Sequence, residues 1–256
     1  MGISSVKRDY LYRLAKDGKR PDGRAFDEYR PIKIERGVIN MAEGSAKVSI
    51  GNTTVLAGIK MDIGEPYPDT PEQGAMSTAV ELIPLASPDF ESGPPRANAI
   101  ELSRVVDRGI RESKFIDLEK LCIESGEKVW IVFIDIHVLD YDGNLFDACS
   151  LAASAALLSA KVPNGRFEMG EDVPMPVGDP PISCTFVKYN GVIAVDPSLD
   201  EDEAAEARYT VAIDKNGDIR AMQKGLSGSF TVEEIKKNIN TARVISKDIR
   251  KVLLED

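Results

Sequence analysis

A long strand followed directly by a helix of small residues is the feature that most restricts how this chain can fold. Residues 128–141 read KVWIVFIDIHVLDY, a run of β-branched and aromatic residues that predicts a long strand. Residues 147–161 read DACSLAASAALLSAK and predict a helix built largely from Ala and Ser. Because such small side chains allow close approach, we expect this helix to pack very tightly against another element.

Helix and strand patterns on either side of this pair predict an α+β chain with two sheets, each covered by helices. A proline-rich segment at 163–181 reads as a linker between the two halves. Before it, helices are expected at 4–17 and 98–118, and strands within 32–63 and 79–85. After it, four strands and a closing helix are expected at 182–188, 191–196, 207–213, 218–223 and 231–254.

The composition excludes some classes of function. The formal net charge of the 256 residues is −10, and such a field repels phosphate. If the chain binds nucleic acid, it must therefore do so through a small local set of arginines. No apolar run approaches the roughly 20 residues that cross a bilayer, and the N-terminus lacks the apolar core of a signal peptide. We therefore expect a cytoplasmic protein without a membrane segment.

Residues that could bind a metal are few and scattered. Cys122, Cys149 and Cys184 lie far apart, each among apolar or small residues, which indicates buried free thiols. His137, the single histidine, falls inside the strand expected at 128–141. The sequence therefore predicts neither a metal nor a cofactor.

Four groups of short motifs run in order along the chain. They are RPDGR at 20–24 with YRPI at 29–32, EGSA at 43–46 with GNTTVLAG at 51–58, ELSR at 101–104, and LDYDGN at 139–144. In order and spacing, these motifs resemble the RNase PH-like family over nearly the whole chain. Within that family, the resemblance is to the non-catalytic ring subunits of the archaeal exosome.

The resemblance implies a fold and a division of the chain. The implied fold is the RNase PH fold, which is ribosomal S5 domain 2-like, with two similar βαβ-containing halves whose mixed sheets are covered by helices. Residues 1–165 would form the first RNase PH-like domain together with the N-terminal helix, and residues 166–256 the second.

The resemblance also implies partners. They are a catalytic RNase PH-like sister subunit in a hexameric ring, a trimer of heterodimers, and RNA-binding cap subunits. Such a ring degrades single-stranded RNA from the 3′ end with inorganic phosphate as the nucleophile.

The segment that should form the phosphate pocket departs from the catalytic members of the family. Those members carry Gly-Ser-Arg or Gly-Thr-Arg before a helix, where backbone N–H groups, a hydroxyl and a guanidinium hold phosphate. Here the matching stretch is 142–147, without a hydroxyl and with Phe146 at the arginine position. Asp147 is expected to cap the helix and to repel an anion. The sequence therefore predicts a structural turn and no catalytic residue here.

The acidic segment departs from the family in the same way. Asp202 matches the first acid of the catalytic members, but Arg208 stands at the position of the second, which reverses the charge. Acidic clusters can bind magnesium, but a solvated loop is the commoner arrangement and the one that we expect. Its other members are Asp196, Asp200, Glu201, Glu203 and Glu206.

Three arginines share one face of the helix expected at 98–118. Arg104, Arg108 and Arg111 are spaced i, i+4 and i+7. From charge alone, the commoner interpretation is a solvated face with Asp107–Arg111 and Arg108–Glu112 pairs. The resemblance implies instead that Arg104 and Arg108 reach the partner's active site and bind RNA phosphates, with Arg111 and then Arg96 as further candidates.

Three alternatives remain open at this stage. A self-sufficient phosphate-dependent exoribonuclease, or a homohexamer that trims tRNA, would release nucleoside diphosphates from RNA without a sister subunit. A purely structural ring spacer would bind RNA equally well after its arginines are replaced.

Overall fold

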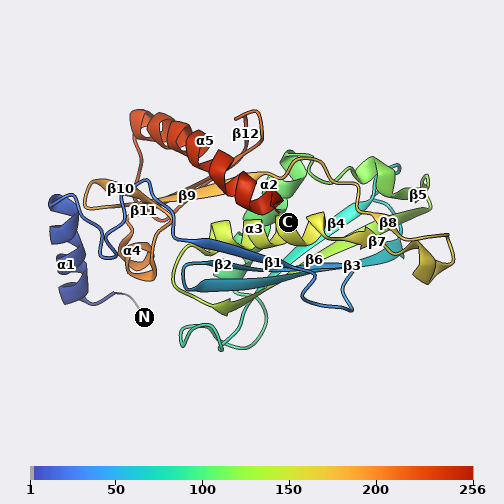
Figure 1. Cartoon of the computed structure of the whole chain (residues 1–256), viewed down its shortest axis with the longest axis horizontal. Helices are drawn as coiled ribbons and strands as arrows, with labels where there is room; N and C mark the ends of the chain where they lie inside the picture. Colours follow the sequence, from blue (N-terminus) through green and yellow to red (C-terminus); the bar gives the residue numbers. More distant parts are fainter. Residues whose placement is uncertain (1–2, 256) are drawn as a thin grey trace.

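The structure is a computed structural model that describes residues 3–255. Figure 1 shows an elongated α+β molecule in which helix α3 (Leu145–Leu158) lies between two groups of strands. Helix α3 contacts β2 and β3 on one side and β9 on the other. This α+β arrangement of helix-covered sheets confirms the predicted fold class.

The first sheet is mixed and has the order β1-β2-β3-β6-β4, with β5 paired to β6 off this path. Its strands are β1 (Ile32–Arg36), β2 (Gly44–Ile50), β3 (Thr53–Gly64), β4 (Ala75–Leu82), β5 (Cys122–Glu124) and β6 (Lys128–Asp140). Neighbours are antiparallel except β4 and β6, which are parallel. The strand expected at 128–141 is thus an inner strand of the sheet.

Alternation along β6 fixes which face of this sheet is buried. Val132, Ile134 and Ile136 are fully buried, whereas Phe133 and Asp135 between them are exposed. Successive side chains of a strand point to opposite faces, so the first set enters the core and the second faces outward.

The second sheet is antiparallel throughout, in the order β10-β9-β11-β12. Its strands are β9 (Ile182–Tyr189), β10 (Val192–Val195), β11 (Ala207–Ile213) and β12 (Ile219–Gly225). The helices of this half are α4 (Leu199–Ala204) and α5 (Val232–Leu254). The expectation of a mixed sheet thus holds for the first half only.

Both halves contain a strand–helix–strand crossover. Helix α2 (Ala97–Glu112) lies between the parallel neighbours β4 and β6, and α4 lies between β10 and β11. In the second half β9 separates the two parallel strands, which is why no parallel pair appears there. Between the halves, the short strand β7 (Lys161–Val162) precedes the proline-rich segment, which itself contains a 3-10 turn η2 (Asn164–Phe167) and β8 (Val173–Pro174).

The tight packing expected of the small-residue helix is confirmed. Residues Leu145–Leu157 of α3 are all buried. A Cβ atom added to Gly44 of β2 would lie 2.5 Å from the Ala156 carbonyl oxygen and 2.6 Å from Cα of Ala160. Only a glycine fits at this crossing. One continuous apolar core then runs through both sheets, from Val48 in β2 to Tyr209 in β11.

Helix α1 (Ser5–Lys16) packs against the second half, although its place in the sequence puts it in the first. Leu11 contacts Ala204 of α4, and Ala15 lies in a cluster with Val187 and Tyr189 of β9. The division at residues 165 and 166 remains a prediction along the sequence.

The helix expected to reach residue 118 ends earlier. Helix α2 stops at Glu112, because Lys114 adopts a left-handed backbone conformation with φ of 52°. Phe115 and Ile116 then turn into the core, and Ile116 forms a bridge to Val177. These tertiary contacts end the helix; a short 3-10 turn, η1 (Leu118–Leu121), follows.

Two of the three cysteines are buried as expected. Cys149 and Cys184 are free and buried, whereas Cys122 is only half-buried. Burial raises the pKa of the Cys149 thiol to about 12.

The single histidine, His137, lies on β6, with its Nδ1 3.4 Å from Oε2 of Glu81. Within residues 3–255, no group of three or more His, Cys, Asp or Glu residues could hold a metal ion.

None of the helices between residues 3 and 255 is long and apolar enough to cross a membrane.

Candidate functional site

The acidic segment is not the solvated loop that the sequence predicted. Asp196 and Glu201 are fully buried, and residues Leu199–Ala204 form α4. Arg20 donates to Glu201 through two hydrogen bonds, Nε to Oε1 at 2.8 Å and Nη2 to Oε2 at 2.6 Å. Neither side chain of this pair is exposed. The prediction failed because Arg20, which binds both Glu201 and the Asp196 carbonyl, lies more than 170 residues before them in the sequence.

Asp196 is the second centre of this buried network. Nη1 of Arg24 and Nε of Arg30 each lie 2.9 Å from its Oδ2, and Nδ2 of Asn144 lies 2.7 Å from its Oδ1. Burial by itself would raise the pKa of Asp196, but the Arg30 guanidinium and the Asn144 amide outweigh it and lower the pKa. The motif at 20–30 thus has a structural role: it binds the N-terminal loop to the second half.

The turn expected to match the family's phosphate pocket is filled by the protein's own side chains. Helix α3 begins at Leu145, after Asn144 in a left-handed conformation, so Asp147 lies in the first turn and is not the cap that we expected. Its carboxylate accepts hydrogen bonds from the Tyr29 hydroxyl at 2.6 Å, from Nδ2 of Asn144 at 2.8 Å and from the Thr185 amide at 2.9 Å. Burial raises the pKa of Asp147 to about 6 despite these donors.

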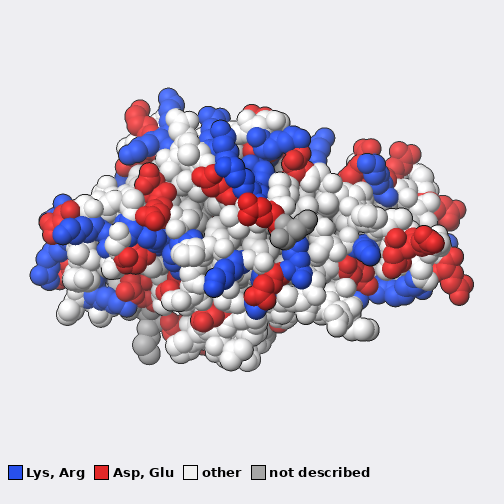
Figure 2. Space-filling view, viewed as in Figure 1, with Lys and Arg blue, Asp and Glu red and all other residues white. Residues whose placement is uncertain are grey.

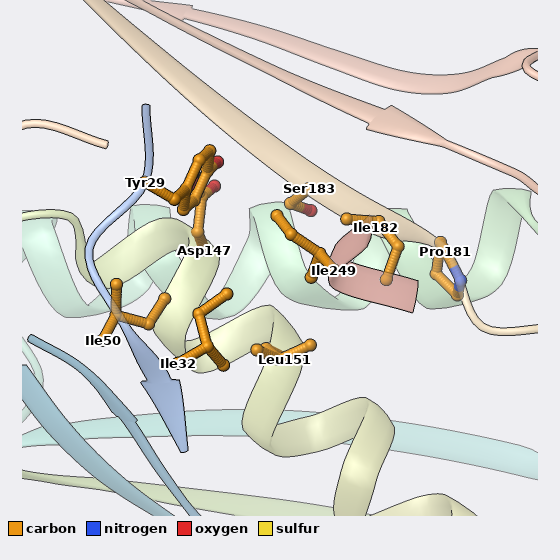
Figure 3. A pocket seen from close by; sticks show the side chains of 9 residues that line it. All are labelled: Tyr29, Ile32, Ile50, Asp147, Leu151, Pro181, Ile182, Ser183 and Ile249. Carbon is orange, nitrogen blue, oxygen red and sulfur yellow. The ribbon is translucent and has the colours of Figure 1, made fainter. Parts of the chain in front are cut away.

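Behind Asp147 lies a small cavity of about 10 Å³, room for roughly one water molecule. Figure 3 shows Asp147 and Tyr29 side by side at one end of this cavity, with apolar side chains such as Ile32, Leu151 and Ile249 around the rest. The cavity has no space for a phosphate ion and no cation on its wall.

Phe146 and Arg208, the two positions that the resemblance implies to differ from the catalytic family members, contact each other. The guanidinium carbon of Arg208 lies 4.1 Å from the centre of the Phe146 ring. Its Nη2 also donates to Oε1 of Glu101 on α2 at 2.6 Å. Close by, burial raises the pKa of Asp202, while the Arg208 charge and the Tyr141 hydroxyl lower it. The cation at this place is therefore balanced by carboxylates of the same chain.

The predicted RNA-binding arginines lie on the outer face of α2. Arg104, Arg108 and Arg111 are all exposed, whereas Val106 and Ile110 on the opposite side are buried. Arg104 and Arg108 line two adjacent hollows. One, of about 340 Å³, lies against β4, and the other, of about 380 Å³, lies against Gln223 of β12.

The three arginines differ in their partners. Within residues 3–255, Arg104 and Arg108 have no hydrogen bond or ion pair. Arg111 is held by Asp107, with Nε 3.1 Å from Oδ2, so one of the two surface pairs suggested by helical spacing forms. The Arg108–Glu112 pair does not form among the described residues. Arg96, the last candidate, pairs with Glu91.

Helix α2 is fixed to the sheet beneath these arginines. The Ser103 hydroxyl donates to the Ala99 carbonyl at 2.8 Å and accepts from the Val80 amide of β4 at 2.9 Å. The bond from Val80 to Ser103 joins the sheet to the helix, so it holds the backbone of the neighbouring Arg104 in place. Sequence reasoning missed the roles of Ser103 and Glu101, although both lie in the motif at 101–104.

The surface charge agrees with local rather than general RNA binding. Figure 2 shows Lys and Arg interspersed with Asp and Glu over the face that carries α5, without a continuous basic surface. In a chain of net charge −10, any binding of phosphate would therefore depend on particular points of the surface.

Comparison with known proteins identifies the class. Residues 28–163 match the 3′ exoribonuclease family, domain 1, and residues 179–245 match domain 2 of the same family. The chain belongs to this family of RNase PH-like proteins, as the motifs had indicated.

The more specific relatives are exosome proteins of archaea. The chain is 56% identical over 251 residues to exosome complex component Rrp42 of Methanocella arvoryzae, which covers 98% of this chain and 96% of the relative. It is 54% identical over 248 residues to the component of the same name from Thermoplasma acidophilum, which covers 97% and 95%.

Solved structures give the same result. A chain of the Archaeoglobus fulgidus exosome with RNA bound to the active site superposes with a TM-score of 0.94 at 49% identity, over 96% of this chain and 97% of that one. A chain of an archaeal exosome core gives 0.91 at 45% identity, over 98% and 97%. The predicted RNase PH fold is confirmed.

Proposed function

We propose that the chain is a non-catalytic ring subunit of an exosome that degrades RNA from the 3′ end with phosphate as the nucleophile. Its relatives at 50% identity and above are exosome components of this family. In this proposal the chain works in the cytoplasm, in a hexameric ring of three heterodimers with a catalytic RNase PH-like sister and RNA-binding caps. Residues 1–165 and 166–256 are its two domains.

The contact between Arg208 and Phe146 carries the proposal that the chain is catalytically silent. A phosphorolytic site needs an arginine for phosphate and an acid for proton transfer. At the two matching positions this chain has an aromatic ring and an arginine, 4.1 Å apart and in contact with each other. Asp147 adds a buried carboxylate in the first turn of α3, where an anion would otherwise bind.

Arg104 and Arg108 carry the proposed RNA binding. They are exposed, without a partner within residues 3–255, and they line neighbouring hollows. A guanidinium group binds phosphate through two parallel hydrogen bonds, and each such contact adds affinity by releasing counterions. A strand held in this way presents its end to the sister's active site in a fixed position, which favours reaction over a diffusive encounter. Because the residues that line these hollows include no aromatic ring, the contact should be to the backbone and independent of sequence.

The decisive experiment compares the purified chain with its complex. We expect no phosphate-dependent release of nucleoside diphosphates from single-stranded RNA by the chain alone, and strong release once the catalytic sister is added. Phosphorolysis by the isolated chain would instead support the self-sufficient exoribonuclease.

The role of the arginines is tested in the same complex with the double variant Arg104→Glu/Arg108→Glu. Losing two phosphate contacts and adding two repulsive charges should weaken RNA binding by about 100-fold at low salt. A matched control is Lys236→Glu/Lys247→Glu on α5, which changes the net charge equally at two exposed lysines. Equal RNA affinity of both double variants would favour a structural spacer.

A further inference from the structure

Glu101 poses an electrostatic problem for the proposed RNA site. It lines the same hollow of about 380 Å³ as Arg104 and Arg108, and it precedes Arg104 by three residues on α2. Side chains three apart on a helix are neighbours, so a free Glu101 carboxylate would pair with Arg104. It would also repel a phosphate that approaches either arginine.

Arg208 removes this problem by holding Glu101 from the side of the second sheet. The distance from Nη2 of Arg208 to Oε1 of Glu101 is 2.6 Å, and the two side chains are 13% and 32% exposed. The Phe146 ring covers the guanidinium at 4.1 Å and so limits its movement. Glu101 is therefore bound to a cation that does not belong to α2.

The backbone of β12 is shaped to admit this arginine. A Cβ atom added to Gly225, which pairs with Arg208 across the β11–β12 ladder, would lie 2.6 Å from Nη2 and 3.0 Å from the guanidinium carbon. Any larger residue at 225 would displace the guanidinium from its place between Phe146 and Glu101. The space left by Gly225 and the stack on Phe146 together fix where Arg208 points.

We propose that Arg208 is a positioning residue for RNA binding: by binding Glu101, it keeps Arg104 and Arg108 unpaired and available to phosphate. This inference rests on the proposed function, since it concerns the same arginines. It assigns a task to the position where catalytic relatives carry an acid. The positive charge of Arg208 neutralises Glu101 in the hollow proposed to bind RNA and does not take part in chemistry.

The test measures the affinity of the reconstituted complex for a labelled single-stranded oligoadenylate over a range of salt. In Arg208→Met, Glu101 should turn to Arg104 and remove one phosphate contact. RNA affinity should then fall about five- to tenfold, and the slope of log affinity against log salt should become smaller by about 0.7.

Rescue by a second substitution separates positioning from a general structural effect. Glu101→Gln in the Arg208→Met background removes the competing carboxylate, so we expect affinity within about twofold of wild type. Arg208→Met alone removes the pair by deleting a charge, whereas Gly225→Ala displaces the same guanidinium with every charge retained. Gly225→Ala should weaken RNA binding in the same direction, and Glu101→Gln should rescue it too.

Two results would overturn the inference. One is unchanged RNA affinity in both Arg208→Met and Gly225→Ala; the other is a loss that Glu101→Gln fails to restore in an assembled complex. Failure of the proposed function looks different, because then Arg104→Glu/Arg108→Glu itself leaves RNA binding intact. If Arg208→Met does not fold, Gly225→Ala with and without Glu101→Gln decides the matter.

Discussion

The arginines of the N-terminal loop and those of α2 are the same residue in opposite environments. Arg20, Arg24 and Arg30 are at most 10% exposed, and each is paired with Asp196 or Glu201. Arg104 and Arg108 are exposed and have no partner within residues 3–255. The first set contributes to the fold, and the second set is left available for a ligand.

The difference separates arginines that stabilise the protein from arginines that remain free to bind a ligand. A buried guanidinium with its hydrogen bonds satisfied by carboxylates has no charge left for RNA. An exposed one gains little stability from the protein itself and can exchange water for phosphate. The two sets should therefore respond in opposite ways, the first in stability and the second in binding.

The largest effect is expected at Arg20. Arg20→Met leaves the buried Glu201 carboxylate without its guanidinium, which should lower the free energy of unfolding by about 3–5 kcal/mol. Urea unfolding followed by circular dichroism measures this, with Arg104→Met as the matched control at less than about 0.5 kcal/mol. Equal stability of the two variants would remove the distinction between the sets.

The buried carboxylates Asp147 and Asp196 should make the stability of the protein depend on pH in opposite ways. Asp147 has no cation among its hydrogen-bond donors, and its pKa of about 6 exceeds the ordinary value of 3.8. Folding therefore takes up a proton between about pH 6 and pH 4, so Asp147 adds stability as the pH falls through this window. At 1.36 kcal/mol per pKa unit, the gain approaches about 3 kcal/mol.

Asp196 should behave in the opposite way. Because the Arg30 guanidinium lowers its pKa, Asp196 contributes stability above its ordinary pKa that is lost as the pH falls through the lowered value.

The contribution of Asp147 is measured by comparing the unfolding of wild type and Asp147→Asn from pH 7 to pH 4. The difference between their pH slopes isolates Asp147, and parallel curves would contradict the raised pKa.

A smaller but specific effect is expected for the double variant Arg104→Met/Arg108→Met. The slope of log RNA affinity against log salt should decrease by about 1.4, twice the value of one contact with a single strand. The free energy of unfolding should stay within about 0.5 kcal/mol of wild type. An unchanged salt slope would mean that these arginines do not contact phosphate.

The smallest effect is expected at Arg111. Its Nε is already bound to Asp107 at 3.1 Å, so the charge it offers to RNA is partly neutralised. Arg111→Met should change RNA affinity by less than about threefold, since an exposed i, i+4 pair is weak and the charge lost is not a free one. A loss as large as that of Arg104→Met would show that Asp107 releases Arg111 when RNA binds.

Local patterns predicted most elements, and tertiary contacts decided the rest. The strand at 128–141 and the helix after it followed from side-chain alternation and small residues, which act within the segment itself. The helix expected to reach residue 118 ended at Glu112. Phe115 and Ile116 are buried in the core, and this burial stabilises the fold more than further turns of α2 would. Helix α3 started at Leu145 because Asn144 adopts a left-handed conformation.

For the candidate site too, local spacing could be predicted from the sequence, whereas contacts between distant segments could not. The common face of Arg104, Arg108 and Arg111 followed from helical spacing alone. No spacing rule could show that Arg208 reaches Glu101, since 107 residues separate them. The buried state of Asp196 and Glu201 was missed for the same reason, because their partners come from the N-terminal loop.

The placement of α3 has a consequence for how the molecule can be divided. Apolar side chains of this helix meet β2 and β3 on one side and β9 on the other, and a single core includes all of them. Removing either half would uncover one whole side of a helix that is buried throughout from Leu145 to Leu157. We therefore expect truncated versions that end near residue 165 to aggregate, and the intact chain to lose both sheets in one cooperative step when it is heated.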